Sequence, residues 1–191
     1  MVYLLLKRGL DLALAFCLLF ILFVPVIAIA LVIKLTSKGP VLYWSDRVGI
    51  DNRIFQMPKF RTMRVDTPQV ATHLMKDPER YLTPCGSILR KLSLDELPQL
   101  WSILKGDMSL VGPRPALYNQ DDLIALRTRK GVHMLVPGIT GWAQVNGRDD
   151  LPIPIKVECD EYYLMNRTFW LDLKILWLTL VNVLTKKGVR H

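Results

Sequence analysis

An almost wholly apolar segment runs from Leu10 to Ile33 and is interrupted by a proline, Pro25. An unbroken helix over this segment would be roughly 36 Å long at about 1.5 Å per residue, enough to cross a bilayer. Pro25 has no amide hydrogen, and its ring clashes with the preceding turn, so it should bend or break such a helix. The two pieces would then be roughly 22 Å and 13 Å long, and neither would span the bilayer alone.

Basic side chains flank both ends of this segment, and these are Lys7, Arg8, Lys34 and Lys38. The positive-inside rule would hold both ends on the cytoplasmic side. A re-entrant helix-break-helix in one leaflet satisfies this charge pattern and the proline, whereas a single spanning helix is the simpler alternative. Arg8 and Asp11 lie three residues apart, a spacing that predicts an ion pair. We expect residues 1–38 to form the re-entrant membrane helix and residues 39–191 a cytosolic catalytic domain.

The remaining residues predict a small, mostly helical α/β domain. Short apolar runs at 41–44 and 54–56 flank a turn at 49–52 and predict a hairpin. Apolar spacing predicts a helix over residues 94–104, with Ser93 as its N-cap. Further helices are expected at 87–92, 120–130, 160–166 and 168–186.

The last of these helices is rich in aromatic residues, including Trp170 and Trp177, and also carries Asp172 and Lys174. This mixture favours an amphipathic helix lying on the membrane surface. A core helix of the soluble domain is the alternative.

The chain is strongly basic, with 25 Lys and Arg against 17 Asp and Glu and a net charge of +8. Such a charge fits an anionic membrane surface, phosphorylated substrates or nucleic acid. The sequence has no aromatic basic platform or recognisable nucleic-acid motif, so we expect no nucleic-acid partner. The three cysteines are isolated and predict neither a disulfide framework nor a zinc site.

Asp95 and Glu96 are adjacent carboxylates in this basic chain. Neighbouring side chains on a helix point about 100° apart, so one acid can face a substrate and the other a metal. Asp160 and Asp172 are further acids in apolar or aromatic surroundings. Carboxylates together with substrate phosphates are the usual ligands of Mg²⁺, so a magnesium ion is the expected cofactor. The alternative is ordinary acidic charge at a helix N-terminus.

Several cations lie beside turns or prolines that could fix them, and these are Lys59, Arg61, Arg90, Arg114 and Arg148. The guanidinium group matches phosphate oxygens, so these residues are candidates for phosphate binding. A solvated basic face near anionic lipid is the alternative. Acids, a divalent metal and fixed arginines on a membrane-surface domain together indicate phosphoryl transfer on a diphosphate substrate.

Several stretches resemble one known family. They are Lys-Phe-Arg-Thr-Met at 59–63, Asp-Glu-Leu-Pro-Gln-Leu-Trp at 95–101, Leu-Lys-Gly-Asp-Met-Ser-Leu-Val-Gly-Pro-Arg-Pro at 104–115, Pro-Gly-Ile-Thr-Gly-Trp-Ala-Gln-Val-Asn-Gly-Arg at 137–148 and Trp-Leu-Asp-Leu-Lys-Ile-Leu at 170–176. Together they resemble the bacterial sugar transferases, the small monotopic polyprenyl-phosphate phosphoglycosyl transferases that initiate glycan assembly.

This resemblance implies transfer of a sugar 1-phosphate from a UDP-sugar to undecaprenyl phosphate, giving undecaprenyl diphospho-sugar and UMP. It implies that Asp95 is the nucleophile and forms a covalent aspartyl phospho-sugar, and that Glu96 holds Mg²⁺. Lys59, Asp160 and Asp172 match other functional positions of the family. Arg114 and Arg148 fall within its motifs and could grip the nucleotide or phosphates.

The resemblance also implies a monotopic enzyme on the cytoplasmic face of the bacterial inner membrane, in contact with inner-leaflet lipid. A homodimer is compatible with the sequence. The chain departs from the family pattern at Val24, where small members often have Ser before Pro25, and at residues 151–155, where Leu-Pro-Ile-Pro-Ile replaces a stretch that usually looks helical. A membrane-anchored scaffold or anion-binding module without catalysis is therefore the competing hypothesis.

Overall fold

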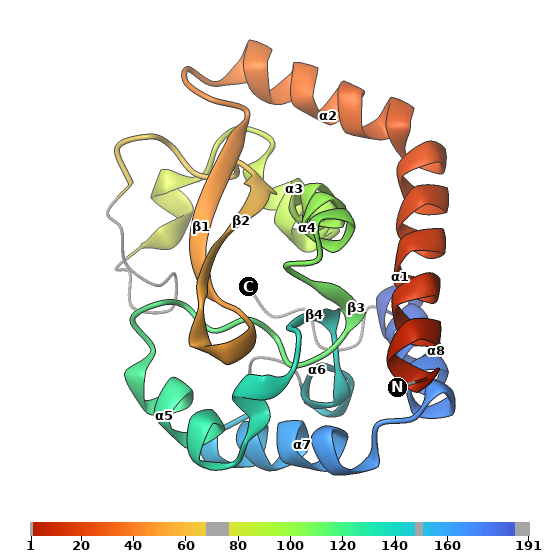
Figure 1. The fold of residues 1–191 in the computed structure, drawn as a ribbon. Helices are drawn as coiled ribbons and strands as arrows, with labels where there is room; N and C mark the ends of the chain where they lie inside the picture. Colours follow the sequence, from red (N-terminus) through yellow and green to blue (C-terminus); the bar gives the residue numbers. More distant parts are fainter. Residues whose placement is uncertain (1, 68–76, 148–150, 186–191) are drawn as a thin grey trace.

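The computed structural model describes residues 2–67, 77–147 and 151–185 (Figure 1). In these residues most of the regular structure is helical, with two small sheets between the helices. The predicted class, a mostly helical α/β domain with a bent N-terminal helix pair, is confirmed.

The N-terminal segment forms two helices, α1 (Val2–Ile21) and α2 (Phe23–Thr36), bent by 62° at Leu22. Pro25 lies in the first turn of α2, where it cannot donate to the Ile21 carbonyl and its ring crowds that group. This explains why the bend comes three residues before the proline. Among the described residues, no single helix is long and apolar enough to cross a bilayer, whereas α1 and α2 meet that criterion together.

α1 begins earlier than the apolar run and is fastened to the rest of the domain through its charged residues. The Arg8 guanidinium donates to the Ile103 carbonyl at 2.7 Å and the Leu104 carbonyl at 3.1 Å, near the C-terminal end of α4 (Leu100–Lys105). Asp11 is buried and its Oδ1 accepts the Leu110 amide at 2.9 Å. The predicted Arg8–Asp11 pair is therefore wrong, because Arg8 binds carbonyls at the end of α4 and Asp11 binds the Leu110 amide.

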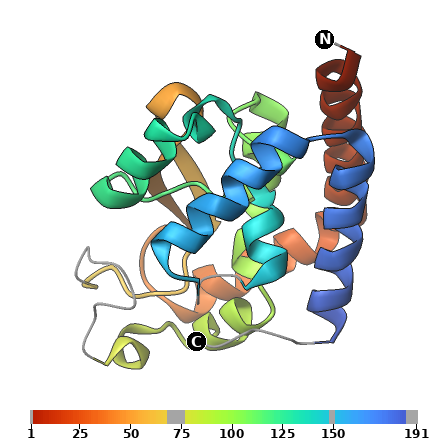
Figure 2. The same cartoon turned by 90° about the horizontal axis from the view of Figure 1, so that it is seen from below.

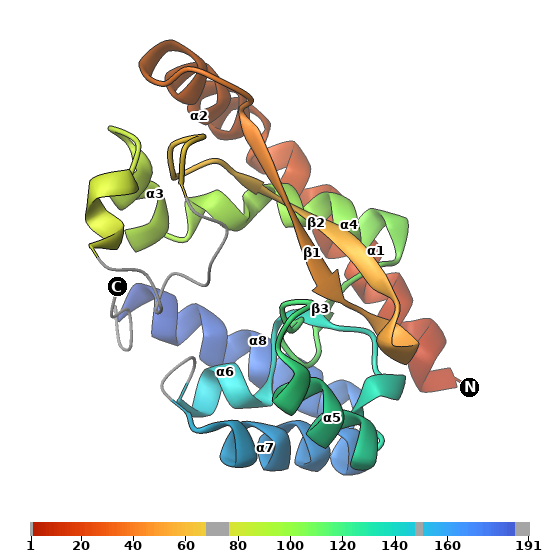
Figure 3. The ribbon, with the colours of Figure 1, turned by 90° about the vertical axis from the view of Figure 1, so that its left-hand side faces the viewer.

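The predicted hairpin is confirmed and is longer than expected. β1 (Leu42–Val48) pairs antiparallel with β2 (Ile54–Phe60) and follows directly on the end of α2 (Figure 3). The reversal uses a 3₁₀ turn, η1 (Ile50–Asn52), in which Asp51 and Asn52 adopt positive φ. Both residue types tolerate that conformation. Lys59 lies near the C-terminal end of β2.

A second sheet pairs β3 (Ser109–Val111) with β4 (Gly138–Thr140) in parallel. A Cβ on Gly138 would overlap the Gly112 amide, so glycine is needed for this close approach. The sheet continues into a segment of alternating prolines, residues 113–115, whose Pro113 carbonyl accepts the Gly138 amide at 2.9 Å.

The predicted helix over 94–104 is divided in two. A 3₁₀ segment, η4 (Leu94–Gln99), precedes α4, because Pro98 cannot donate the bond that a continuous α-helix needs. Ser93 occupies the predicted N-cap position with φ of 55°, but its side chain makes no cap bond. The other short elements are η3 (Pro78–Tyr81), α3 (Gly86–Lys91), α5 (Asp121–Arg129), η5 (Val132–Met134) and α6 (Trp142–Asn146).

α7 (Ile153–Asn166) begins seven residues earlier than the predicted helix at 160–166. Pro152 precedes this helix and Pro154 lies in its first turn, where a missing amide hydrogen costs little. The proline-rich departure from the family pattern is therefore a helix start.

α8 (Phe169–Leu184) confirms the predicted last helix, and Thr168 caps it by accepting the Leu171 amide. Its Asp172 and Ile175 are buried, whereas Trp170 and Trp177 are exposed. One face of this helix is therefore buried, as expected for a core helix, and the other exposes aromatic side chains, as expected for an amphipathic surface helix. Figure 2 shows α8 beside α1, which also carries exposed large apolar side chains such as Phe16 and Phe20.

Candidate active site

The acid pair lies on η4, which packs against β2. Asp95 is buried, and the Glu96 side chain is 19% exposed. Oε1 of Glu96 accepts the Lys59 ammonium at 2.7 Å and the Arg114 guanidinium at 3.0 Å. Lys59 comes from β2 and Arg114 from the segment between two prolines, so tertiary packing brings these cations to one carboxylate.

The two acids have opposite electrostatic environments. Burial raises the pKa of Asp95, and Glu96 raises it further, against the opposing charges of Lys59 and Arg90. Burial would also raise the pKa of Glu96, but Arg114 and Lys59 together outweigh it and hold that pKa well below its ordinary value. Glu96 is therefore a fixed anion, whereas Asp95 is a poorly solvated carboxylate in a cationic surrounding, which suits attack on a phosphorus centre.

Arg90 belongs to the same cluster. It lies in the last turn of α3, and its Nε donates to Thr62 Oγ1 at 3.0 Å. Burial lowers its pKa, and the nearby Asp95 charge opposes that shift. The structure thus brings together two acids and three cations of the predicted site: Asp95, Glu96, Lys59, Arg90 and Arg114.

The other predicted site residues are placed elsewhere. Arg61 donates to the Ser37 hydroxyl at 2.6 Å and to backbone carbonyls just after α2. Asp160 is buried against Arg127, and Asp172 is buried near the start of α1. Arg148 lies outside the described residues.

Sequence comparison gives the family of this chain. A model of the bacterial sugar transferase family matches residues 2–186. The chain belongs to the bacterial sugar transferase family.

Three relatives of the chain have the following similarities to it. The chain is 44% identical to an uncharacterised sugar transferase, EpsL, of Bacillus subtilis (strain 168), over 97% of the chain and 91% of the relative. It is 40% identical to the UDP-N-acetylgalactosamine-undecaprenyl-phosphate N-acetylgalactosaminephosphotransferase of Aeromonas hydrophila, over 99% of the chain and 46% of the relative. It is 38% identical to the UDP-glucose:undecaprenyl-phosphate glucose-1-phosphate transferase of Escherichia coli (strain K12), over 96% of the chain and 41% of the relative. The chain thus spans less than half of these two larger transferases.

The acid pair of this sugar transferase offers two carboxylates to a metal ion. Among the described residues, no group of three or more His, Cys, Asp or Glu side chains is arranged to bind a metal ion. Mg²⁺ commonly takes one or two carboxylates and completes its shell with water and substrate phosphates. Asp95 and Glu96 match this number of carboxylates.

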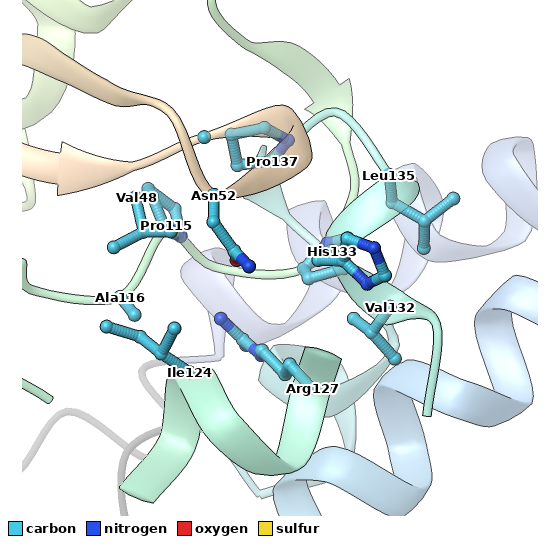
Figure 4. A pocket seen from close by; sticks show the side chains of 12 residues that line it. Val48, Asn52, Pro115, Ala116, Ile124, Arg127, Val132, His133, Leu135 and Pro137 are labelled. Carbon is cyan, nitrogen blue, oxygen red and sulfur yellow. The ribbon is translucent and has the colours of Figure 1, made fainter. Parts of the chain in front are cut away.

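Two small cavities lie beside residues 113–116. Figure 4 shows a pocket between η1, residues 113–116, α5 and η5, with Arg127 and His133 in its wall. Its volume is about 30 Å³, room for about one water molecule. A second cavity, beside Gln99 and Arg114, is about 10 Å³. Neither is large enough to hold a nucleotide sugar.

Sequence reasoning did not select four buried or half-buried polar residues as site candidates: Tyr3, Lys7, Arg127 and Tyr163. Arg127 lies in a predicted helix among other basic residues, and nothing in its neighbourhood distinguishes it from a solvated arginine. Its role becomes visible only when α5 packs against α7.

Proposed function

We propose that this chain transfers a sugar 1-phosphate from a UDP-sugar to undecaprenyl phosphate, releasing UMP and forming undecaprenyl diphospho-sugar. The observation that carries the proposal is the buried Asp95 beside Glu96, which Lys59 and Arg114 hold by hydrogen bonds of 2.7 Å and 3.0 Å. The names of the two larger relatives support the substrate classes, a UDP-sugar and undecaprenyl phosphate.

In the first proposed step, a carboxylate oxygen of Asp95 attacks the β-phosphorus of the donor. The bond from that phosphorus to the bridging oxygen breaks, UMP leaves with the electron pair, and an aspartyl phospho-sugar remains. In the second step, a phosphate oxygen of undecaprenyl phosphate attacks the same phosphorus and releases the Asp95 carboxylate. Each step exchanges one phosphorus–oxygen bond for another, so no redox partner is needed.

The neighbouring residues have distinct roles in this mechanism. Lys59, Arg90 and Arg114 offset the negative charge of the diphosphate and of the transition state. Glu96 would hold Mg²⁺, which supplies further neutralisation of phosphate charge when bound. Salt bridges to Lys59 and Arg114 keep Glu96 ionised, so it is available as a ligand at any pH at which Asp95 can attack.

The reaction is tested with the purified chain, undecaprenyl phosphate and Mg²⁺ against a panel of UDP-sugars, with UMP release as the readout. We expect release with at least one donor and only slow release when the lipid acceptor is omitted. An inactive scaffold would instead bind lipid or nucleotide and release no UMP with any donor. The productive donor also identifies the sugar.

We propose further that α1 and α2 enter the inner leaflet from the cytoplasmic face and return to it, at the bacterial inner membrane. The 62° bend and the exposed apolar side chains of both helices support this topology. Single cysteines at Val2 and Tyr43, in a chain lacking its own cysteines, report on the two ends, since both positions are exposed.

A membrane-impermeant maleimide should label neither cysteine in sealed spheroplasts and both after permeabilisation. Phe20→Cys, near the bend, is the matched control and should stay protected in both states, because lipid would surround it. Labelling of only one end in sealed spheroplasts would show a spanning arrangement instead.

A further inference from the structure

We propose that Arg127 is a positioning residue of the transferase site, and that Asp160 acts through Arg127 rather than by touching the donor. This inference rests on the proposed function, because it assigns the two residues to the placement of Arg114 beside Glu96. It changes the sequence-based expectation that Asp160 binds substrate or phosphate.

The Arg127 side chain uses all three of its nitrogens. From α5, its Nε and Nη2 donate to Oδ2 of Asp160 on α7 at 3.0 Å and 2.6 Å. Its Nη1 donates to the backbone carbonyl of Arg114 at 2.8 Å. Asp160 is 1% exposed and Arg127 8%. A single guanidinium thus links the α5–α7 packing to the residue that binds Glu96.

The backbone around Arg114 is held at three consecutive carbonyls. The Pro113 carbonyl accepts the Gly138 amide at 2.9 Å, and the Pro115 carbonyl accepts Arg47 Nη1 at 3.2 Å. Arg127 holds the carbonyl between them. The two prolines also restrict the local dihedral angles. The main chain is therefore fixed, and this fixation sets the direction in which the Arg114 side chain reaches Glu96.

Asp160 is suited to hold Arg127 and poorly placed to bind an anion. The whole side chain is buried, its Oδ2 is held by Arg127, and a carboxylate repels phosphate. Arginine offers several donors in a rigid fork, so a fixed partner such as Asp160 orients the remaining donor toward the Arg114 carbonyl. Charge-assisted bonds of this type are stronger than neutral ones.

The central test uses the double variant Arg127→Met/Asp160→Leu, which removes both charges and leaves no buried ion without a partner. Such a replacement is often neutral for stability. We expect a near-parental melting temperature, but a kcat for UMP release about 10- to 100-fold lower, because small displacements of catalytic groups cost rate. The single variant Arg127→Met should lose both stability and rate, since it leaves Asp160 unpaired.

Two further variants distinguish a positioning role of Arg127 from a general effect on the packing of α5 and α7. Lys130→Met removes the neighbouring Lys130–Glu161 pair at 3.0 Å, which joins the same two helices without touching Arg114, and should leave kcat unchanged. In an Arg114→Ala background, the rate loss caused by the double variant should nearly vanish, because its effect passes through Arg114. A full loss in that background, or normal kcat in the double variant, would overturn the inference.

Amide hydrogen exchange gives a readout that does not depend on turnover. The double variant should speed exchange of the amides of Arg114, Ala116, Leu117 and Tyr118 about tenfold, whereas Lys130→Met should not. Unchanged exchange at this segment would overturn the positioning role even in an active enzyme. Faster exchange in a chain that releases no UMP with any donor would instead refute the proposed reaction while leaving Arg127 as the group that holds this segment.

Discussion

Replacement of Asp95 by Asn is expected to abolish sugar-phosphate transfer while leaving the protein folded. Asparagine has nearly the same shape but lacks the carboxylate that would attack phosphorus. We expect a loss in kcat of about 10⁴-fold or more, the scale seen when a catalytic nucleophile is removed. UMP release measures the rate, and denatured protein from a reaction with sugar-labelled donor measures the covalent intermediate. Normal turnover, or label retained on the variant, would refute the nucleophile assignment.

The same substitution should raise the melting temperature at neutral pH. Because burial raises the pKa of Asp95, its ionised form is less stable in the folded than in the unfolded state. The resulting penalty is present at neutral pH, decreases as pH falls through the raised pKa of the folded state, and disappears below the ordinary value of about 3.9, where both states are protonated. The gain from Asp95→Asn should therefore shrink over the same range.

Glu96→Gln is the matched control for stability, because the pKa of Glu96 is shifted in the opposite direction from that of Asp95. Lys59 and Arg114 lower the pKa of Glu96, so its charge stabilises the fold above its ordinary pKa, and that stabilisation is lost as pH falls. We expect Glu96→Gln to lower the melting temperature at neutral pH. A decrease for both variants would indicate ordinary loss of packing and contradict the electrostatic argument.

Replacement of Asp172 by Asn is expected to give the largest loss of stability. Asp172 is 1% exposed, and its Oδ2 accepts Tyr3 Oη at 2.9 Å and Lys7 Nζ at 3.1 Å. Its Oδ1 accepts Tyr163 Oη at 2.6 Å. The pKa of Tyr163 is raised by burial and by Asp172, which keeps this hydroxyl protonated as a donor. Loss of the carboxylate leaves the Lys7 ammonium without its ionic partner.

Breaking a buried pair in this way costs about 3–5 kcal/mol. A loss of 3 kcal/mol corresponds to a decrease in melting temperature of roughly 10 °C for a domain of this size. Thermal unfolding in detergent measures it. Lys7→Met/Asp172→Leu, which removes both charges, should recover much of the loss. Asp66→Asn breaks an exposed pair with Arg64 and should change little. An unchanged midpoint in Asp172→Asn would show that the cluster does not hold α1.

The Asp172 cluster also connects the N-terminal helix with the site. Lys7 Nζ donates to the Val111 carbonyl at 2.8 Å, and Tyr163 Oη lies 3.5 Å from the same oxygen. Val111 directly precedes the segment that carries Arg114. The position of α1 and the placement of Arg114 therefore depend on neighbouring parts of one hydrogen-bonded framework.

Features that depend on local chemistry could be predicted from the sequence. Pro25 predicts the bend of the N-terminal helices because it lacks an amide hydrogen, and residues 49–52 predict the hairpin because their turn chemistry is local. Helix boundaries were less accurate near prolines: the bend lies at Leu22, three residues before Pro25, and α7 begins at Ile153, between two prolines. Motifs also indicated Asp95 and Glu96 as a pair with divided roles.

The long-range arrangement required the tertiary structure. Arg8 and Asp11 are correctly spaced for an ion pair, yet each binds a backbone group about 95 to 100 positions away in the chain. Lys59, Arg90 and Arg114 were all candidates, but only packing of β2, α3 and η4 shows that they surround the acids. Asp160 and Asp172 look alike in sequence, and only burial assigns one to Arg127 and the other to Lys7.

The sequence by itself indicated which residues are candidates for the chemistry, because residue type alone fixes where the carboxylates, cations and prolines stand in the chain. The tertiary structure alone decided what those groups do to one another. Burial raises the pKa of Asp95, two cations lower that of Glu96, and Arg127 holds the backbone of Arg114. These effects depend on desolvation and on distances of about 3 Å between residues far apart in the chain, which spacing along the sequence does not specify.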